Sequence, residues 1–174
     1  MRKFFLFVLT LIASIGLLSA CDEADVEKVD NEEENTEQND EDKEEKLSIG
    51  DTVMFDDLKI TLNEVRIEEG GEFDEPEEDQ FIVANLTIEN EGDDEENISS
   101  IMNIELKDDE GYSYTTTILT EGTKGQLDGA IEPGGKMKGE IPFDVPESDS
   151  YELHFADPFA SGKAVWDIPN DALE

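Results

Sequence analysis

Apolar and polar residues alternate in short runs from Leu47 to the end of the chain, and this period of two constrains the fold most strongly. Successive side chains of a β-strand point to opposite faces of its sheet, so the alternation predicts strands with one buried face. The predicted inward-facing sets are Leu58, Ile60 and Leu62; Val65 and Ile67; Ile82, Ala84, Leu86 and Ile88; Met102, Ile104 and Leu106; Met137, Ile141, Phe143 and Val145; Tyr151, Leu153 and Phe155; and Ala164, Trp166 and Ile168. No sustained apolar stripe of helical period interrupts them, so we expect an all-β domain.

Turn-forming residues separate the predicted strands, for example Gly70-Gly71 and Pro133-Gly134-Gly135. Short strands at this spacing predict an antiparallel β-sandwich with one buried face on each sheet. The inward parity changes between Leu62 and Val65, which predicts a β-bulge near Asn63-Glu64. Pro142 falls in the outward set of its strand, so we expect that strand at a sheet edge.

The first twenty residues, 1–20, have the pattern of a secretory signal peptide. Arg2 and Lys3 precede an almost uninterrupted apolar run from Phe4 to Ala20, and acidic residues follow instead of a basic stop-transfer cluster. The exit, Leu18-Ser19-Ala20-Cys21, resembles the lipobox of bacterial lipoproteins. That resemblance implies cleavage between Ala20 and Cys21 and attachment of a diacylglyceryl group, with acyl chains such as palmitate, to the Cys21 thiol.

Cys21 is the only cysteine of the chain, so lipidation would also consume a thiol that is otherwise open to intermolecular pairing. Two acyl chains anchor a protein far more firmly than one. We therefore expect the membrane to be a partner through lipidated Cys21, and the chain to lie on the outer face of the cell membrane. A plain secreted protein with an incidental cysteine is the alternative.

Residues 21–46 join the lipidation site to the predicted domain, residues 47–174. From Asp22 to Lys46 there are 14 acidic residues and 3 lysines, a net charge of −11, and apolar residues are nearly absent. Such a segment cannot bury enough surface to offset the entropy of ordering, so it is predicted to be a disordered acidic linker. A spacer is the favoured interpretation, and a cation-binding segment is the alternative.

Three stretches of the predicted domain resemble a known family. They are "IGDTVMFDDLKITLNEVRI", "FIVANLTIENEGDD" and "IEPGGKMKGEIPFDVPESDSYELHFADPF". They look like small telokin-like extracellular domains of unknown function, which share the fold of a mycobacterial immunoprotective secreted antigen and are common in lipoproteins of Gram-positive bacteria. The resemblance covers roughly residues 48–168. It implies an immunoglobulin-like sandwich and a Gram-positive source, and it supplies no active site. The acidic insertion Glu68 to Asp79 departs from the pattern.

No catalytic residue, cofactor site or metal site is predicted. The single histidine, His154, falls in the outward set of its strand, and nothing in the sequence pairs it with a nucleophile, so we expect a surface histidine without a role. Zinc and copper sites need several His or Cys ligands, which the predicted domain lacks. Phe155 and Trp166 alternate inward, so core packing is favoured over an aromatic ligand platform.

Calcium is the metal that the acidic loops could bind. The candidates are residues 68–79, 89–97 and 107–111, which are rich in Asp and Glu. None has the D-x-D-x-D-G spacing of an EF-hand loop, so solvated acidic loops are favoured over specific sites.

The predicted domain carries 34 acidic and 7 basic residues, a net charge of −27, within a chain of net charge −36. Nucleic-acid binding is excluded, because it requires positive charge facing phosphate. The excess of like charge favours a halophilic source, with an alkaliphilic one as the alternative. For function, we expect a binding module for an extracellular protein, glycan or ion. The alternatives are a calcium-binding or purely structural envelope domain, and an enzyme is disfavoured.

Overall fold

The computed structural model describes residues 26–29, 47–71, 73–160 and 162–173. Its elements in chain order are β1 Val26–Lys28, β2 Leu47–Ser48, β3 Thr52–Phe55, β4 Leu58–Glu68, β5 Gln80–Asn90, β6 Glu96–Ile98, α1 Ser100–Asn103, β7 Ile104–Asp108, β8 Ser113–Tyr114, β9 Gly129–Ile131, β10 Lys136–Val145, β11 Ser150–Phe155, β12 Ala164–Pro169 and the 3₁₀ turn Asn170–Ala172. The all-β prediction is confirmed.

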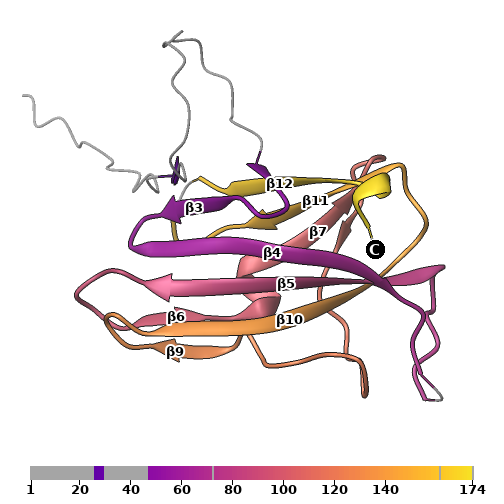
Figure 1. Cartoon of the computed structure of the whole chain (residues 1–174), viewed down its shortest axis with the longest axis horizontal. Helices are drawn as coiled ribbons and strands as arrows, with labels where there is room; N and C mark the ends of the chain where they lie inside the picture. Colours follow the sequence, from indigo (N-terminus) through magenta and orange to yellow (C-terminus); the bar gives the residue numbers. More distant parts are fainter. Residues whose placement is uncertain (1–25, 30–46, 72, 161, 174) are drawn as a thin grey trace, which may run out of the picture.

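Two five-stranded sheets stack face to face as an immunoglobulin-like β-sandwich (Figure 1). One sheet has the strand order β1-β3-β4-β5-β10, and the other has the order β2-β12-β11-β7-β8. The short pair β6-β9 forms a separate ribbon. Pairing is antiparallel except between β2 and β12, among the strands that the structure describes. Each sheet therefore has one edge near the N-terminal strands and one edge at β10 or β8.

The core lies between the two sheets and is built from the predicted alternation. Ile60, Leu86 and Phe143 of one sheet are fully buried, as are Leu106 and Trp166 of the other. Phe155 meets Phe55 across the sandwich in an edge-to-face contact, with ring centroids 5.3 Å apart. The indole of Trp166 donates a hydrogen bond to the Asp51 carbonyl at 3.2 Å. The interpretation of Phe155 and Trp166 as core residues is confirmed.

Two local predictions are also confirmed. The register between β4 and β5 shifts between Leu62 and Glu64, where the sequence predicts a bulge. Pro142 lies in β10, the terminal strand of its sheet. Its carbonyl accepts a hydrogen bond from Thr117 instead of from β5, so the side of the residue that lacks an N–H faces the edge.

Met102 is a correction to the predicted core. It lies in the single turn of α1 and is 57% exposed, because the strand begins only at Ile104. The alternation of Met102 with Ile104 and Leu106 therefore extended the strand by one inward position too many. Ile67, which was also predicted to face inward, is 37% exposed near the end of β4.

The predicted linker contains a second correction. Val26–Lys28 form β1, which pairs antiparallel with β3 in the register Val26 to Phe55 and Lys28 to Val53. The prediction of disorder for residues 21–46 was thus wrong for this strand. Three residues in an acidic stretch are too few to show alternation, whereas the exposed edge of β3 supplies partners for their backbone groups.

The other expectations for the N-terminal part concern the signal peptide 1–20, cleavage between Ala20 and Cys21, lipidation of Cys21, and the remainder of the linker, 30–46. They fall outside the described residues. None of the described helices is long and apolar enough to cross a membrane.

Candidate functional site

Two long loops meet at the β10 and β8 edge of the sandwich. The first, residues 69–79, joins β4 to β5, and the second, residues 115–128, joins β8 to β9. The second loop follows the outer edge of β10, where the amide of Thr117 donates to the Pro142 carbonyl at 2.9 Å and the amide of Glu140 donates to the Lys124 carbonyl at 3.0 Å. It thus covers backbone groups that an edge strand would otherwise expose.

Close packing holds the second loop against β10. A Cβ atom added at Gly139 would lie 2.7 Å from the Gln126 carbonyl carbon, so only glycine allows this approach. Leu119 is 8% exposed and forms a small apolar cluster with Phe81 and Val83 on the outer face of β5. Sequence alternation misses this second, outer cluster because Leu119 and its neighbours lie in a loop without periodicity.

Arg66 ties the second loop to the sheet. Its guanidinium donates to the Gly122 carbonyl at 2.7 Å and to Glu140 Oε2 at 3.0 Å. Burial acts to raise the pKa of Glu140, but hydrogen bonds from Arg66 and Asn85 outweigh it and hold that pKa below its ordinary value. Arg66 is the only arginine among residues 47–174. One of the few positive charges of this acidic domain is therefore used to hold the second loop on the sheet.

Asp74 joins the two loops to each other. Its carboxylate accepts hydrogen bonds from the Thr120 hydroxyl at 2.7 Å, the Thr120 amide at 2.8 Å and the Glu121 amide at 3.3 Å. The hydroxyl of Thr120 contributes most to lowering the pKa of Asp74, with the two amides adding to it. The acidic insertion Glu68 to Asp79 is therefore built into the fold through Asp74.

Asp144 of β10 fixes the other end of the first loop. Its two carboxylate oxygens accept hydrogen bonds from the amides of Glu77 and Glu78, at 2.8 and 3.0 Å. The amide of Asp79 then donates to the Val145 carbonyl, which leads the chain into β5. The insertion is thus held in its middle through Asp74 and at its C-terminal end through the amides of residues 77–79.

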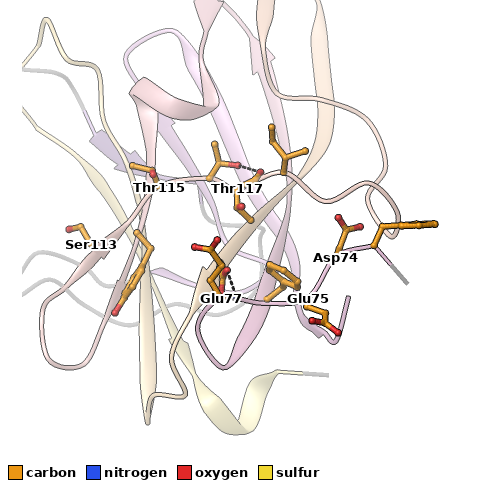
Figure 2. Close-up of a pocket in the computed structure, with 12 residues that line it drawn as sticks. Asp74, Glu75, Glu77, Ser113, Thr115 and Thr117 are labelled. Atoms are coloured by element: carbon orange, nitrogen blue, oxygen red, sulfur yellow. Dashed lines mark hydrogen bonds between the residues drawn. The ribbon is translucent and has the colours of Figure 1, made fainter. Parts of the chain in front are cut away.

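A groove of about 540 Å³ lies between these loops. Its lining residues are Phe73, Asp74, Glu75, Glu77, Phe81, Ser113, Tyr114, Thr115, Thr116, Thr117, Ile118 and Asp144. Figure 2 shows the labelled acidic residues coming from the first loop and the labelled hydroxyl residues from β8 and the segment after it. The lining thus combines carboxylates, hydroxyls and apolar side chains, and it includes no basic residue.

Two large apolar side chains at the groove are open to solvent. Phe73 is 76% exposed and Ile118 is 88% exposed, and each comes from a different loop. Single exposed apolar residues are common on protein surfaces. Here two of them lie beside a groove, which is the setting in which such residues serve binding. The groove is accordingly the candidate functional site.

Tyr114, which lines the groove, is paired with a carboxylate outside the lining. Tyr114 donates a hydrogen bond to Asp108 Oδ2 at 2.7 Å. Burial and this hydrogen bond raise the pKa of Tyr114. Burial acts to raise the pKa of Asp108, but hydrogen bonds from Tyr114 and the Tyr112 amide outweigh it and lower that pKa. The predicted calcium loop 107–111 therefore uses Asp108 as an internal hydrogen-bond acceptor.

His154 is a correction to the predicted surface. Its side chain is only 4% exposed, although it points to the outer face of β11 as predicted. Nε2 lies 2.9 Å from Glu152 Oε2, and Nδ1 lies 3.6 Å from Glu105 Oε1. Burial lowers the pKa of His154, partly offset by Glu152. Glu105 lies opposite His154 on β7, and Glu152 lies two residues before it on β11. These glutamates cover the ring, and alternation alone does not predict that cover.

A second, small cavity of about 100 Å³ collects acidic residues from the predicted calcium loop 89–97 and elsewhere. Asp56, Asp57, Glu96 and Asp157 line it. Burial, followed by the charges of Asp57 and Asp157, raises the pKa of Glu96. Within the described ranges, no three His, Cys, Asp or Glu side chains are grouped so that they could hold a metal ion.

Similar structures support the fold. YjhA from Bacillus subtilis has a TM-score of 0.55 and 17% identity, with 70% of this chain and 98% of that chain covered. YcdA, a candidate lipoprotein from the same organism, has a TM-score of 0.54 and 16% identity. The match covers 66% of this chain but only 37% of YcdA, so this chain spans less than half the length of YcdA. A β-sandwich protein from Clostridium difficile has a TM-score of 0.50 and 21% identity, with 76% and 99% covered. At these identities the likeness concerns the fold alone.

Sequence comparison gives the family. No curated protein matches the chain. A family profile described as a domain of unknown function, DUF4352, matches residues 47–165, which is more than half of the chain and runs from β2 into β12. The chain therefore belongs to the DUF4352 family of domains of unknown function.

Proposed function

We propose that this chain is a lipoprotein of the outer face of a bacterial cell membrane, and that its sandwich binds an extracellular ligand in the groove between residues 69–79 and 115–128. The anchor is Cys21, within the lipobox-like segment Leu18-Ser19-Ala20-Cys21. A candidate lipoprotein among the similar structures supports a surface location. Two of the similar structures come from Bacillus subtilis, which supports a Gram-positive source.

The observation that carries the binding role is the exposure of Phe73 and Ile118 at the groove. Leaving large apolar side chains in water forgoes roughly 1.5–3 kcal/mol each relative to burial. A ligand that covers them would recover part of this free energy. Binding is favoured over catalysis because the lining offers carboxylates, hydroxyls and apolar surface, whereas His154 is buried on another strand among carboxylates.

Calcium binding is not adopted as a second function. In the predicted loops, Asp74 and Asp108 accept internal hydrogen bonds, and Glu96 lines the small cavity. The described residues contain no grouping suited to a metal ion.

The anchor is tested by metabolic labelling. Cells that express the wild-type chain with radioactive palmitate should yield a labelled protein that partitions into the detergent phase. The Cys21→Ala variant should do neither. Equal labelling of the two proteins would contradict the anchor.

The groove is tested with residues 22–174, which omit the lipidation site. The immobilised wild type should retain a component of the bacterial envelope that a Phe73→Ser/Ile118→Ser double variant does not. Both side chains are largely exposed, so this variant should fold. A double variant at two other exposed apolar positions, Ile101→Ser/Met102→Ser, is the matched control. Retention that is unchanged in the groove variant would contradict the proposed site.

A further inference from the structure

The groove has the charge of a site for a cation. Four of its lining residues, Asp74, Glu75, Glu77 and Asp144, are acidic, and the lining contains no lysine or arginine. Asp74 and Asp144 are held by backbone amides, so their positions are fixed by the fold. Glu75 and Glu77 are exposed and free to meet a ligand. The domain's net charge of −27 also disfavours a second copy of this chain as the occupant.

One wall of the groove is an open edge of extended chain. β8 is the terminal strand of its sheet, paired only with β7 through Tyr114 and Ser113. Within the described residues, the amide of Thr115 donates to no acceptor, and the register of β8 on β7 points it away from β7, because consecutive amides of an extended chain face opposite sides. Thr115 is exposed at the groove. Unpaired amides along an edge are the groups to which an added peptide strand hydrogen-bonds.

The two apolar side chains lie beside this edge. Ile118 follows the Thr115–Thr117 stretch, and Phe73 lines the groove from the other loop. A peptide that pairs with an edge gains affinity from main-chain hydrogen bonds and specificity from alternate side chains. Apolar residues of such a peptide would contact Phe73 and Ile118, and its intervening basic residues would meet Glu75 and Glu77.

We propose that the ligand of this groove is an extended polypeptide segment that bears lysine or arginine, an inference that rests on the binding function proposed above. The segment lies along Ser113–Thr115 and adds main-chain hydrogen bonds to that edge, which ends where the Thr117 amide is already paired with β10. A volume of about 540 Å³ falls within the roughly 300–1,000 Å³ typical of ligand pockets.

The test measures dissociation constants for three probes against residues 22–174 in 0.15 M NaCl. The probes are a short peptide of alternating lysine and valine, the same peptide with serine in place of lysine, and a neutral N-acetylglucosamine oligosaccharide. The lysine peptide should bind most tightly. Tighter binding of either neutral probe would overturn the cationic assignment.

Matched charge variants separate a site from general attraction to an acidic surface. Glu75→Gln/Glu77→Gln should weaken binding of the lysine peptide about fivefold, the range expected when two partly exposed ion pairs are lost. Glu95→Gln/Glu132→Gln removes the same charge from exposed positions outside the groove lining and should change binding less than about twofold. Equal effects of the two variants would overturn the proposal.

A backbone variant tests the peptide geometry. Thr115→Pro removes the edge amide and should abolish most binding, whereas Thr115→Ala should retain it. Binding that survives Thr115→Pro would overturn edge pairing. If Phe73→Ser/Ile118→Ser abolishes binding while the Gln and Pro variants do not, the ligand class fails and the groove function stands.

A separate observation concerns the anchor. β1 pairs with β3, the amide of Val29 donates to the Thr52 carbonyl at 2.9 Å, and Lys28 Nζ lies 3.1 Å from Asp51 Oδ2. Hydrogen-bonded pairs alternate along an antiparallel ladder, so Glu27 and Met54 form the preceding hydrogen-bonded pair. The chain is thus fastened to the sandwich only five residues after Cys21.

The geometry points to a short tether. With Cys21 lipidated, five residues span at most about 18 Å, whereas the 26 residues from Cys21 to Leu47 could span about 90 Å. β1 therefore holds the sandwich close to the membrane, and residues 30–46 connect two strands of the same domain instead of setting its distance. β10 is four strands from β1, about 19 Å away, so the groove opens on the side far from the anchor.

The tether is tested by energy transfer in vesicles that carry the lipidated protein. A fluorophore on Met54→Cys should transfer energy to acceptors on the lipid headgroups. Adding Glu27→Pro should lower the transfer, because proline removes the ladder amide and releases β1. Glu32→Pro, the same change in residues 30–46, should leave it unchanged. Equal transfer in the two proline variants would overturn the short tether.

A lipid-free readout checks β1 by itself. In a Cys21→Ala background, Glu27→Cys/Met54→Cys should form a disulfide readily, since hydrogen-bonded partners lie about 5.5 Å apart at Cα. Glu32→Cys/Met54→Cys should form it slowly. Similar rates for the two pairs would contradict the docked strand.

Discussion

The two edges of the β1-β3-β4-β5-β10 sheet are protected in different ways. At the β3 edge, three residues from the N-terminal side of the chain add a strand, and Lys28 pairs with Asp51. At the β10 edge, a loop runs alongside and covers the strand through Thr117, Lys124 and close contact at Gly139. At the first edge β1 becomes the new terminal strand, whereas the second edge has a groove beside the loop.

The difference shows how one sandwich can carry an attachment and a binding surface at separate edges without conflict. Strand addition uses backbone groups and needs little side-chain packing, since Val26 remains 37% exposed. The loop at the other edge needs its own apolar contacts, supplied by Leu119, Phe81 and Val83. We therefore expect the groove edge to depend on buried side chains, and the β1 edge to depend on hydrogen bonds and one ion pair.

The largest effect is expected from truncating the apolar contact at the groove edge. Leu119→Ala should lower the free energy of unfolding by about 2–3 kcal/mol, because it leaves a cavity over Phe81 and Val83. Val26→Ala at the other edge should cost less than about 1 kcal/mol, because that side chain is already partly in water. Urea titrations of both variants measure the two losses of unfolding free energy. Equal losses would contradict the expected difference between the two edges.

The next effect concerns the link between the two loops. Asp74→Asn should increase hydrogen exchange at the Thr120 and Glu121 amides severalfold, since an amide side chain cannot accept all three of the hydrogen bonds that the carboxylate accepts. Exchange at the β1 and β3 amides should not change. An increase that spreads to the β3 edge would show that the two edges are coupled.

Asp74 also makes this link dependent on pH. Its pKa in the folded protein lies below the ordinary value of 3.8, so its contribution to stability is fully present above that value. The contribution is lost as the pH falls through the folded pKa. A carboxyl ¹³C NMR titration should give a midpoint below 3.8, and a midpoint above it would contradict the three hydrogen bonds.

The smallest effect is expected at the Lys28–Asp51 ion pair. Both side chains are partly exposed, so Lys28→Ala should cost only about 0.5 kcal/mol, and less in high salt. The loss should appear in thermal unfolding at low ionic strength. A cost that persists undiminished in 1 M NaCl would mean that the pair stabilises the edge by something other than charge.

Sequence alone predicts the sandwich because period-two alternation reports which face of a strand is buried, whatever the strand's partner. The bulge at Leu62 and Glu64 and the edge position of Pro142 follow from the same local rule. His154 breaks the rule in a limited way. It points outward as predicted, yet neighbouring glutamates bury it, and alternation says nothing about how far outer side chains cover one another.

The groove could not be predicted in this way. Asp74 and Thr120 are 46 positions apart in loops without periodicity, and only the fold brings them together. Phe73 and Ile118 are isolated apolar residues in polar stretches, so neither gives a sequence signal by itself. The outward position of Phe81 and Val83 on β5, within the continuous apolar run Phe81–Ala84, was the one available hint that something covers that face.

The most direct test maps where a ligand binds. Amide chemical shifts of residues 22–174 would be followed by NMR during titration with the alternating lysine and valine peptide. We expect saturable changes at residues 73–77 and 113–118, and none at residues 26–29 and 52–55. Changes spread evenly over the acidic surface, or concentrated at the β1 and β3 edge, would contradict the assignment of the groove edge as the binding edge.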